Sequence, residues 1–263
     1  YNHTDGRAEE ELIENAIKGK EEGFTALGHL NPYLDEPRNQ PFHDNNTQML
    51  YNAERRIARV REAVGEDTDL CLELHRRLEP GLAVQLSARL EPYAPMFLED
   101  PIRPDNFDEM ARVAQQCQIP IATGERINSL FEFEMLLERG ACSYVRASIG
   151  VCGGFTGIKK IAALAEAHHK RLVPHNPLSP VTTNALLQFC AATDNIAICE
   201  YPDPYAASTA DHTQIPKFEK GYVEIPEGPG LGIDLISDVE ERFPFRPHAV
   251  GTRLNLDGSI CDQ

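Results

Sequence analysis

Three glutamates recur at equal intervals along the chain, and each one closes a short apolar segment. Glu73, Glu99 and Glu125 are spaced 26 residues apart in both steps. In a barrel of about 250 residues, one strand, one helix and two short loops take roughly 25–30 residues. The interval therefore predicts that the three carboxylates stand at the carboxyl ends of three successive parallel strands, where they converge on one point.

Three converging carboxylates repel one another unless a cation lies between them. Carboxylate oxygens are the ligands that Mg²⁺ prefers, and substrate or water oxygens complete its octahedral shell. Each residue taken alone could instead be an exposed loop carboxylate or a partner for a helix N-terminus. The shared spacing favours a metal site, and we expect one Mg²⁺ held by Glu73, Glu99 and Glu125.

The chain as a whole alternates between helical and extended patterns. Helical periodicity appears at 8–22, 46–64, 80–93, 105–117, 129–139, 156–169 and 181–192. Short apolar or β-branched runs follow at 24–30, 69–74, 95–99, 119–123, 143–149, 171–175 and 196–200, and Tyr1 to His3 adds one more strand. Continuous apolar runs are typical of parallel strands buried on both faces. No Gly-x-Gly-x-x-Gly motif follows the first strand, which disfavours a dinucleotide-binding fold.

This alternation predicts an α/β fold, namely a (β/α)₈ TIM-type barrel over residues 1–235. Residues 31–45 form a polar, proline-rich loop after the second strand, which a barrel places at its catalytic end. Residues 201–235 are also rich in loop-forming residues. Residues 236–263 leave little room for another strand–helix unit, so we expect a C-terminal tail that packs outside the barrel.

Composition narrows the class of partner and the compartment. A net charge of −16 disfavours nucleic acid and anionic membrane surfaces, although a bound cation lets an acidic protein accept an acidic substrate. The seven cysteines include no Cys-x-x-Cys pair, which indicates reduced, structural thiols in a cytoplasmic protein. We see no signal peptide and no apolar run of about 18 residues, so we expect no membrane partner.

Three further residues at strand ends are candidates for chemistry. His75 lies two residues after Glu73, and alternation along a strand predicts that both side chains share one face. His175 ends a strand between two prolines and is a candidate general base or acid. Either histidine could instead be a satisfied structural residue. Glu200 ends the last run and is a candidate hydrogen-bonding or polarising group for the substrate, or else a salt-bridge partner at the barrel rim.

Several stretches together resemble the enolase superfamily in its mandelate racemase branch, and most closely its sugar-acid dehydratases of the galactonate dehydratase type. They include LELHRRLEP at 72–80, MFLEDPIRP at 96–104, IPIATGERI at 119–127 and VPHNPLSPV at 173–181. In that family an α+β capping domain precedes the barrel. The resemblance therefore implies that this chain is the barrel part of a two-domain protein and lacks an N-terminal portion. It also implies that the tail at 236–263 packs on the cap, and that the protein is a homo-oligomer.

The resemblance further implies a Mg²⁺-dependent dehydratase that acts on an acid sugar, an aldonic acid such as galactonate. The histidine matching His175 takes the proton next to the carboxylate to give an enediolate, and the one matching His75 protonates the departing hydroxyl. Loss of water then leads to a 2-keto-3-deoxy acid. Glu200 is implied to contact the substrate, which is the expected small-molecule partner.

The chain departs from the family pattern at several positions. Glu73 replaces a more usual aspartate, and Ser148 replaces the aspartate that often orients the base histidine, so His175 lacks a charged partner there. The run that includes His29 replaces the Lys-x-Lys motif of racemases and cycloisomerases. Two alternatives stay open: a cycloisomerase or epimerase of a related sugar acid or lactone, and a non-catalytic family member that only binds the ligand.

Overall fold

The computed structural model describes residues 1–33, 45–176, 179–202, 216–247 and 257–259. Its main sheet has seven strands, all parallel and paired in chain order. They are β1 (Asn2–His3), β2 (Ala26–Leu30), β3 (Asp69–Glu73), β4 (Phe97–Glu99), β5 (Ile121–Thr123), β6 (Tyr144–Val145) and β7 (Arg171–Leu172). The parallel strand order matches the sequence prediction.

Residues 196–201 complete the ring between β7 and β1. Ile196 forms a parallel bridge with Leu172 of β7. On the other side the amino group of Tyr1 donates to the carbonyl of Cys199 at 2.6 Å, and Tyr201 N–H donates to the carbonyl of Tyr1 at 2.8 Å. The eighth predicted strand is therefore present as a short paired segment, and the (β/α)₈ barrel prediction is confirmed.

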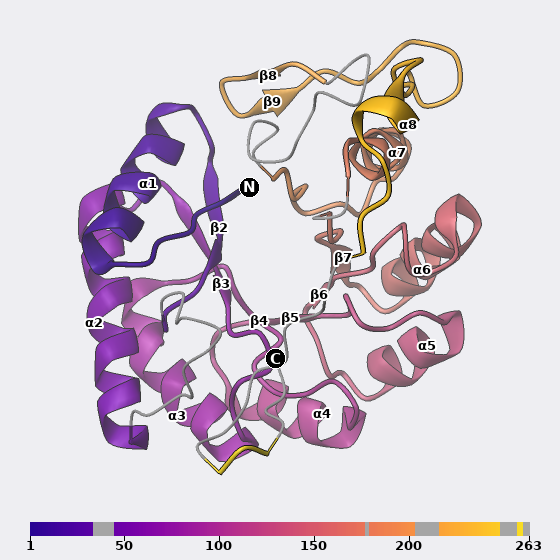
Figure 1. Cartoon of the computed structure of the whole chain (residues 1–263). Coiled ribbons are helices and arrows are strands. Elements are labelled where there is room, and N and C mark those ends of the chain that lie inside the picture. Colours follow the sequence, from indigo (N-terminus) through magenta and orange to yellow (C-terminus); the bar gives the residue numbers. More distant parts are fainter. Residues whose placement is uncertain (34–44, 177–178, 203–215, 248–256, 260–263) are drawn as a thin grey trace.

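Seven helices follow the strands and enclose them in an arc (Figure 1). Their N-termini explain where they begin: Asn45, Ser129 and Ser179 accept hydrogen bonds from backbone N–H groups in the first helical turn. The helices are α1 (Glu9–Glu21), α2 (Asn46–Val64), α3 (Pro80–Leu90), α4 (Phe107–Gln116), α5 (Leu130–Glu138), α6 (Gly154–Ala167) and α7 (Pro180–Ala191), with a 3₁₀ turn, η1 (Glu91–Tyr93), after α3.

Two apolar layers lie on the two faces of the sheet. The outer and larger layer fills the space between strands and helices, with residues such as Leu72, Leu98 and Ile57. The inner layer fills the barrel itself and consists of Tyr1, Ala26, Cys71, Phe97, Ala122 and Val173, with the partly buried Tyr144 packed against them. Alternation along each strand assigns neighbouring residues to opposite layers, so the inner layer fixes which side chains face the barrel mouth.

The segment after the barrel forms a short antiparallel hairpin, β8 (Phe218–Glu219) with β9 (Tyr222–Val223), and a short helix α8 (Val239–Arg242). Phe218 stacks on Phe24, with ring centroids 4.3 Å apart, which joins the hairpin to the start of β2. The loop predicted over 31–45 falls largely outside the described residues. The division at residue 235 and the packing of the tail on a cap remain predictions.

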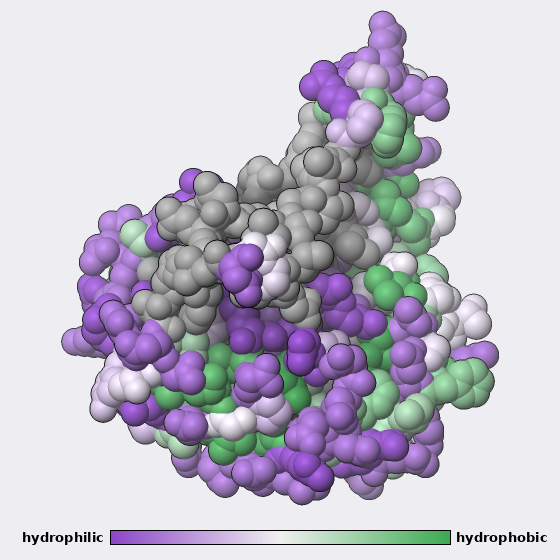
Figure 2. All heavy atoms as spheres, turned by 60° about the horizontal axis from the view of Figure 1, so that its bottom comes forward, coloured by the Kyte–Doolittle hydropathy of each residue, from purple (hydrophilic) through white to green (hydrophobic). Residues whose placement is uncertain are grey.

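On the face seen in Figure 2, hydrophilic side chains predominate among the described residues, and hydrophobic ones gather in areas between them. This distribution follows from helices that bury one apolar stripe and expose the opposite face. No helix among the described residues is long and apolar enough to cross a membrane.

Candidate active site

The alternation of side chains along the strands accounts for the position of most site residues. Going toward the carboxyl end of a strand, the residue two positions beyond an inner-layer residue again faces the barrel interior. Here that position is polar on five strands: His3 follows Tyr1, Glu73 follows Cys71, Glu99 follows Phe97, Arg146 follows Tyr144 and His175 follows Val173. The apolar barrel core therefore ends in a polar layer at the mouth.

The three predicted metal ligands come together in this polar layer. Glu73, Glu99 and Glu125 each offer one carboxylate oxygen, and these oxygens all lie within 4.8 Å of one another. In addition, Glu73 and Glu99 are paired residue to residue on β3 and β4. The structure thus brings together the residues that the 26-residue interval selected, and only small side-chain movements would be needed for them to share one ion.

The electrostatics of the three carboxylates fit a cation. Burial raises the pKa of Glu73 well above its usual range, and the charges of Glu99 and Glu125 raise it further. Burial also raises the pKa of Glu99, although Arg146 opposes this rise. A divalent cation between the three oxygens would offset both effects. The oxygen-only donor set suits Mg²⁺ rather than a thiolate-seeking metal.

Arg146 is a buried residue of the site that sequence reasoning missed. Its side chain is 1% exposed, and its Nε donates to Glu99 at 2.5 Å while its Nη2 donates to Glu200 at 2.8 Å. Its Nη1 donates to the carbonyl of Val173 at 2.8 Å. One guanidinium therefore fixes a candidate metal ligand and the last-strand carboxylate relative to each other.

A second arginine lies on the Glu125 side. Arg76 Nη1 donates to Glu125 at 2.7 Å and lies 3.6 Å from Asp100, which in turn accepts from the Thr123 hydroxyl at 2.5 Å. Burial would raise the pKa of Glu125, but His175 and Arg76 outweigh it and hold that pKa at about 2. Burial, together with Glu125 and Glu99, raises the pKa of Asp100 to about 7.

His175 stands beside the carboxylate group. Its Nε2 lies 3.1 Å from Glu125 Oε2. Its backbone bridges to Ser148 on the neighbouring strand, yet neither His175 Nδ1 nor Ser148 Oγ has a hydrogen-bond partner among the described residues. Ser148, which stands where the family pattern often has an aspartate, is therefore the bridge partner of His175 but does not orient its ring.

His75 also lies at the site, but the reason given by strand alternation is wrong. β3 ends at Glu73, and His75 has a left-handed backbone with a φ of 51°. The turn lets the N–H of His75 donate to Glu73 Oε1 at 2.5 Å, and places Arg76 Nη2 3.1 Å from the His75 ring. Burial and then the charge of Arg76 lower the pKa of His75 to about 4.

Glu200 lies inside the barrel and not on its rim. Its side chain is 1% exposed, and it accepts hydrogen bonds from Arg146, from the backbone N–H of Asn176 at 2.8 Å and from the His3 ring at 2.6 Å. Burial would raise the pKa of Glu200, but Arg146 and His3 outweigh it and hold that pKa well below its usual range. Glu200 is thus an anionic anchor for the side of the mouth between β7 and β1.

A family model described as enolase C-terminal domain-like matches residues 36–239. The chain belongs to the enolase superfamily. Its relatives include a D-mannonate dehydratase of Caulobacter vibrioides, 30% identical over 280 residues that cover 99% of this chain and 70% of the relative. The D-galactonate dehydratase family member RspA of Halomonas elongata is 31% identical over 218 residues, covering 82% of this chain and 54% of the relative.

Solved structures of this superfamily share the barrel. A mandelate racemase/muconate lactonizing enzyme from Jannaschia sp. CCS1 superposes with a TM-score of 0.85 at 30% identity, covering 95% of this chain and 67% of that one. An enolase from Agrobacterium radiobacter, bound to sodium and L-malate, has a TM-score of 0.86 at 27% identity, with coverages of 99% and 69%. The chain spans about half the length of several curated relatives that it matches.

Proposed function

We propose that the protein is a Mg²⁺-dependent dehydratase that converts an acid sugar, an aldonic acid such as galactonate, to a 2-keto-3-deoxy acid. One observation carries this proposal: three carboxylates, two of them buried and the third mostly so, converge, and a histidine contacts the group on each of two sides. His175 meets Glu125, and the backbone of His75 meets Glu73. The relatives named galactonate and mannonate dehydratases, and the malate bound in a structural neighbour, support an acid substrate.

The site residues divide the proton transfers between them. When bound at Glu73, Glu99 and Glu125, Mg²⁺ supplies positive charge beside the substrate carboxylate, which lowers the cost of removing the neighbouring proton. His175 takes that proton as general base. We assign to His75 the proton that goes to the hydroxyl on the next carbon, which leaves as water; because burial and Arg76 hold the His75 pKa at about 4, this role requires that the bound substrate anion raise that pKa. The resulting enol becomes the keto acid. Glu200, held by Arg146, contacts the substrate from the last strand.

A screen of aldonic and aldaric acids on the full-length protein with Mg²⁺ tests the proposal. We expect a 2-keto acid that reacts with semicarbazide, and we expect His175→Asn to abolish exchange of the α-proton in deuterated water. A product of unchanged mass would indicate a cycloisomerase or epimerase. Binding without turnover of any acid would indicate a ligand-binding protein. Undiminished exchange in the His175 variant would move the base to another residue.

We also propose that the protein acts in the cytoplasm. Six of its cysteines lie in the described part of the chain, and all six are free thiols. Assembly into a homo-oligomer remains a prediction.

A further inference from the structure

The second strand breaks its alternation next to the mouth. Ala26 belongs to the inner layer and Leu27 to the outer one, so regular alternation would turn Gly28 inward and His29 outward. Instead, the pairing register shifts between Leu27 and Leu30, and His29 has a φ of 53°. Leu30 packs in the outer layer at the place that regular alternation would give to His29, so the His29 side chain does not pack there. Irregularities of this kind re-aim side chains beside active sites.

The re-aimed ring stacks on His3 from the first strand. The two ring centroids are 4.7 Å apart and the ring planes are 19° from parallel. Each ring is anchored through one nitrogen to a carboxylate: His3 Nε2 lies 2.6 Å from Glu200, and His29 Nδ1 lies 3.5 Å from Asp5. A carboxylate that is ionised only accepts, so both anchoring nitrogens carry the proton.

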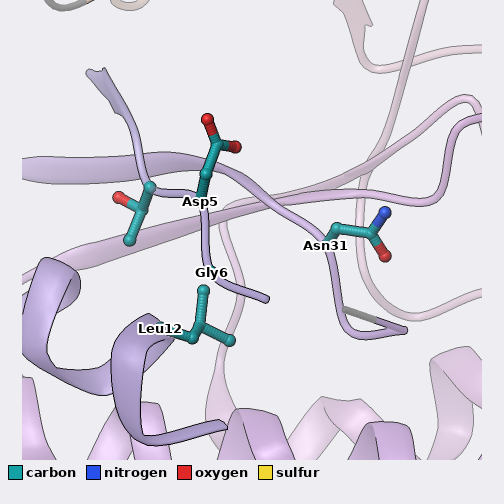
Figure 3. A pocket seen from close by; sticks show the side chains of 5 residues that line it. Asp5, Gly6, Leu12 and Asn31 are labelled. Atoms are coloured by element: carbon teal, nitrogen blue, oxygen red, sulfur yellow. The ribbon is translucent and has the colours of Figure 1, made fainter. Parts of the chain in front are cut away.

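Asp5 is held at the edge of the mouth by the turn after β1. A small, open hollow beside it is lined by Leu12 and Asn31, among others. Figure 3 shows the Asp5 carboxylate pointing away from Leu12, on the side opposite the helix. Asp5 Oδ1 lies 3.5 Å from His29 Nδ1.

The second nitrogen of each ring is open for a ligand. His3 Nδ1 and His29 Nε2 have no hydrogen-bond partner in the part of the chain that the structure describes, and neither is a buried atom. A neutral ring accepts a hydrogen bond there, and a protonated ring donates one. A hydroxyl group matches both states, whereas an anion matches only protonated rings, and two stacked charged rings would repel each other.

The pair is linked to the carboxylate group through Glu200, which contacts His3 and also accepts from Arg146, the hydrogen-bond partner of Glu99. Burial by itself would lower the pKa of His29. Asp5, together with the charges of Glu200 and Glu99, outweighs burial and raises that pKa. In the strand order, β2 with His29 lies between β1, which carries His3, and β3, which ends at Glu73.

We propose that the stacked His3–His29 pair is a subsite for hydroxyl groups, and that it receives two neighbouring hydroxyls of the substrate's polyol chain. The inference rests on the proposed function, because an acid sugar held by its carboxylate at the metal must extend its hydroxyl-bearing carbons across the mouth. The two anchoring carboxylates orient the open nitrogens, and the shifted register of β2 brings the rings face to face. The pair thus determines specificity for polyhydroxy acids over short ones.

Calorimetric binding to the full-length protein with Mg²⁺ tests the subsite, with D-galactonate and D-mannonate compared against glycolate, which lacks the polyol chain. His29→Phe keeps the stacked ring and removes both nitrogens. We expect it to weaken binding of the better-bound aldonate by roughly two- to tenfold, the range of one hydrogen bond, and to leave glycolate unchanged. His169→Phe is the matched control, because His169 also has a left-handed backbone, with a φ of 56°, and is exposed outside the site.

A second variant keeps the test decisive if phenylalanine disturbs the fold. His29→Asn suits the left-handed backbone and should show the same selective loss. Equal weakening of aldonate and glycolate, or no weakening of either, would overturn the subsite. Because binding is measured, the two proposals fail separately. Selective loss of aldonate binding without any keto-acid product would contradict the dehydratase proposal and support the subsite. Formation of the keto acid without selective loss of aldonate binding would support the dehydratase proposal and contradict the subsite.

Discussion

At the residue scale, Ser148 and His175 pose a specific question about the base. They are bridge partners on neighbouring segments, and each keeps a buried polar atom without a partner among the described residues. Buried polar atoms are normally paired, and an unpaired one costs free energy. The serine therefore does not replace the orienting role of an aspartate, and the contact of His175 with Glu125 takes its place.

Ser148→Ala should consequently be tolerated. Removing a hydroxyl that makes no hydrogen bond is expected to leave the free energy of unfolding unchanged, or to raise it by up to about 1–3 kcal/mol. Catalysis should stay within about twofold of the parent. Denaturant unfolding and the rate of α-proton exchange check both statements. A large loss of exchange with a normal unfolding curve would show that Ser148 reaches His175, for example through a water.

The His29–Asp5 pair makes a pH-dependent contribution to the free energy of unfolding, and the two pKa shifts fix its sign. Asp5 raises the pKa of His29 above its ordinary 6.5 despite burial, and a hydrogen bond from His29 lowers the pKa of Asp5 below its ordinary 3.8. The pair therefore stabilises the fold between about pH 4 and pH 6.5. This contribution disappears as the pH rises through the folded pKa of His29, and as it falls through that of Asp5.

Asp5→Asn should lower the pKa of His29 and remove this contribution. Both side chains are more than one third exposed, so the loss should stay below about 1 kcal/mol. Melting temperatures of parent and variant are expected to differ at pH 5.5 and to converge at pH 8.5. The double variant with His29→Asn isolates the pair. A difference that grows toward alkaline pH would contradict the assigned sign.

At the element scale, close approach at Gly28 governs how β1 and β2 pack inside the barrel. A Cβ at Gly28 would lie 1.7 Å from the Tyr1 ring, which is buried in the inner layer. In a well-packed interior, neighbouring side chains and backbone can shift to admit an extra atom only at a cost in folding free energy. Gly28 therefore sets the spacing of the two strands immediately before the register shift that re-aims His29.

Gly28→Ala should destabilise the protein by about 1–3 kcal/mol and weaken binding of polyhydroxy acids, because either the Tyr1 ring or β2 must shift. Gly81→Ala is the matched control. Gly81 lies in the first turn of α3, and a Cβ there meets nothing within 4 Å, so that change should be neutral or stabilise by up to about 1 kcal/mol. Urea unfolding of the two variants measures the difference. Equal effects would show that the Tyr1 contact is not tight.

At the scale of the whole molecule, sequence reasoning found those features that repeat with the barrel period. The 26-residue interval identified Glu73, Glu99 and Glu125 because each stands at or just beyond the carboxyl end of its own strand. Arg146 carries the same signal, two residues after Tyr144, but a charged residue after a short apolar run reads as an exposed rim residue. Only its pairing with two buried carboxylates explains why it is inside.

Other features depend on contacts between strands and could not be read from one segment. The turn that places His75 begins where β3 ends, and strand alternation does not continue through it. The position of His29 depends on the register between β2 and β3 and on the Tyr1 ring against Gly28. Local periodicity describes a strand by itself, whereas a bulge is a property of a pair of strands.

The buried carboxylates also link ligand binding to the stability of the whole barrel. An ion that binds only the folded state stabilises it by mass action, by about 2.7 kcal/mol at 100 times its dissociation constant. In a barrel of this size each kcal/mol raises the melting temperature by roughly 2–4 °C. Saturating Mg²⁺ should therefore raise the melting temperature of the chelator-treated protein by roughly 5–10 °C, as followed by calorimetry, with KCl at equal ionic strength as the salt control.

Glu99→Gln decides whether that shift arises at the proposed site. The amide keeps the size of the side chain but removes a negative charge from the carboxylate group, so the Mg²⁺-dependent shift and the activity should both be lost. Glu109→Gln, on the outer helix α4, should retain the full shift, because Glu109 lies away from the three glutamates and pairs with Arg112 at the surface. A Mg²⁺ shift of equal size in Glu99→Gln would mean that the ion binds elsewhere, and the three glutamates would then lose their assignment as ligands.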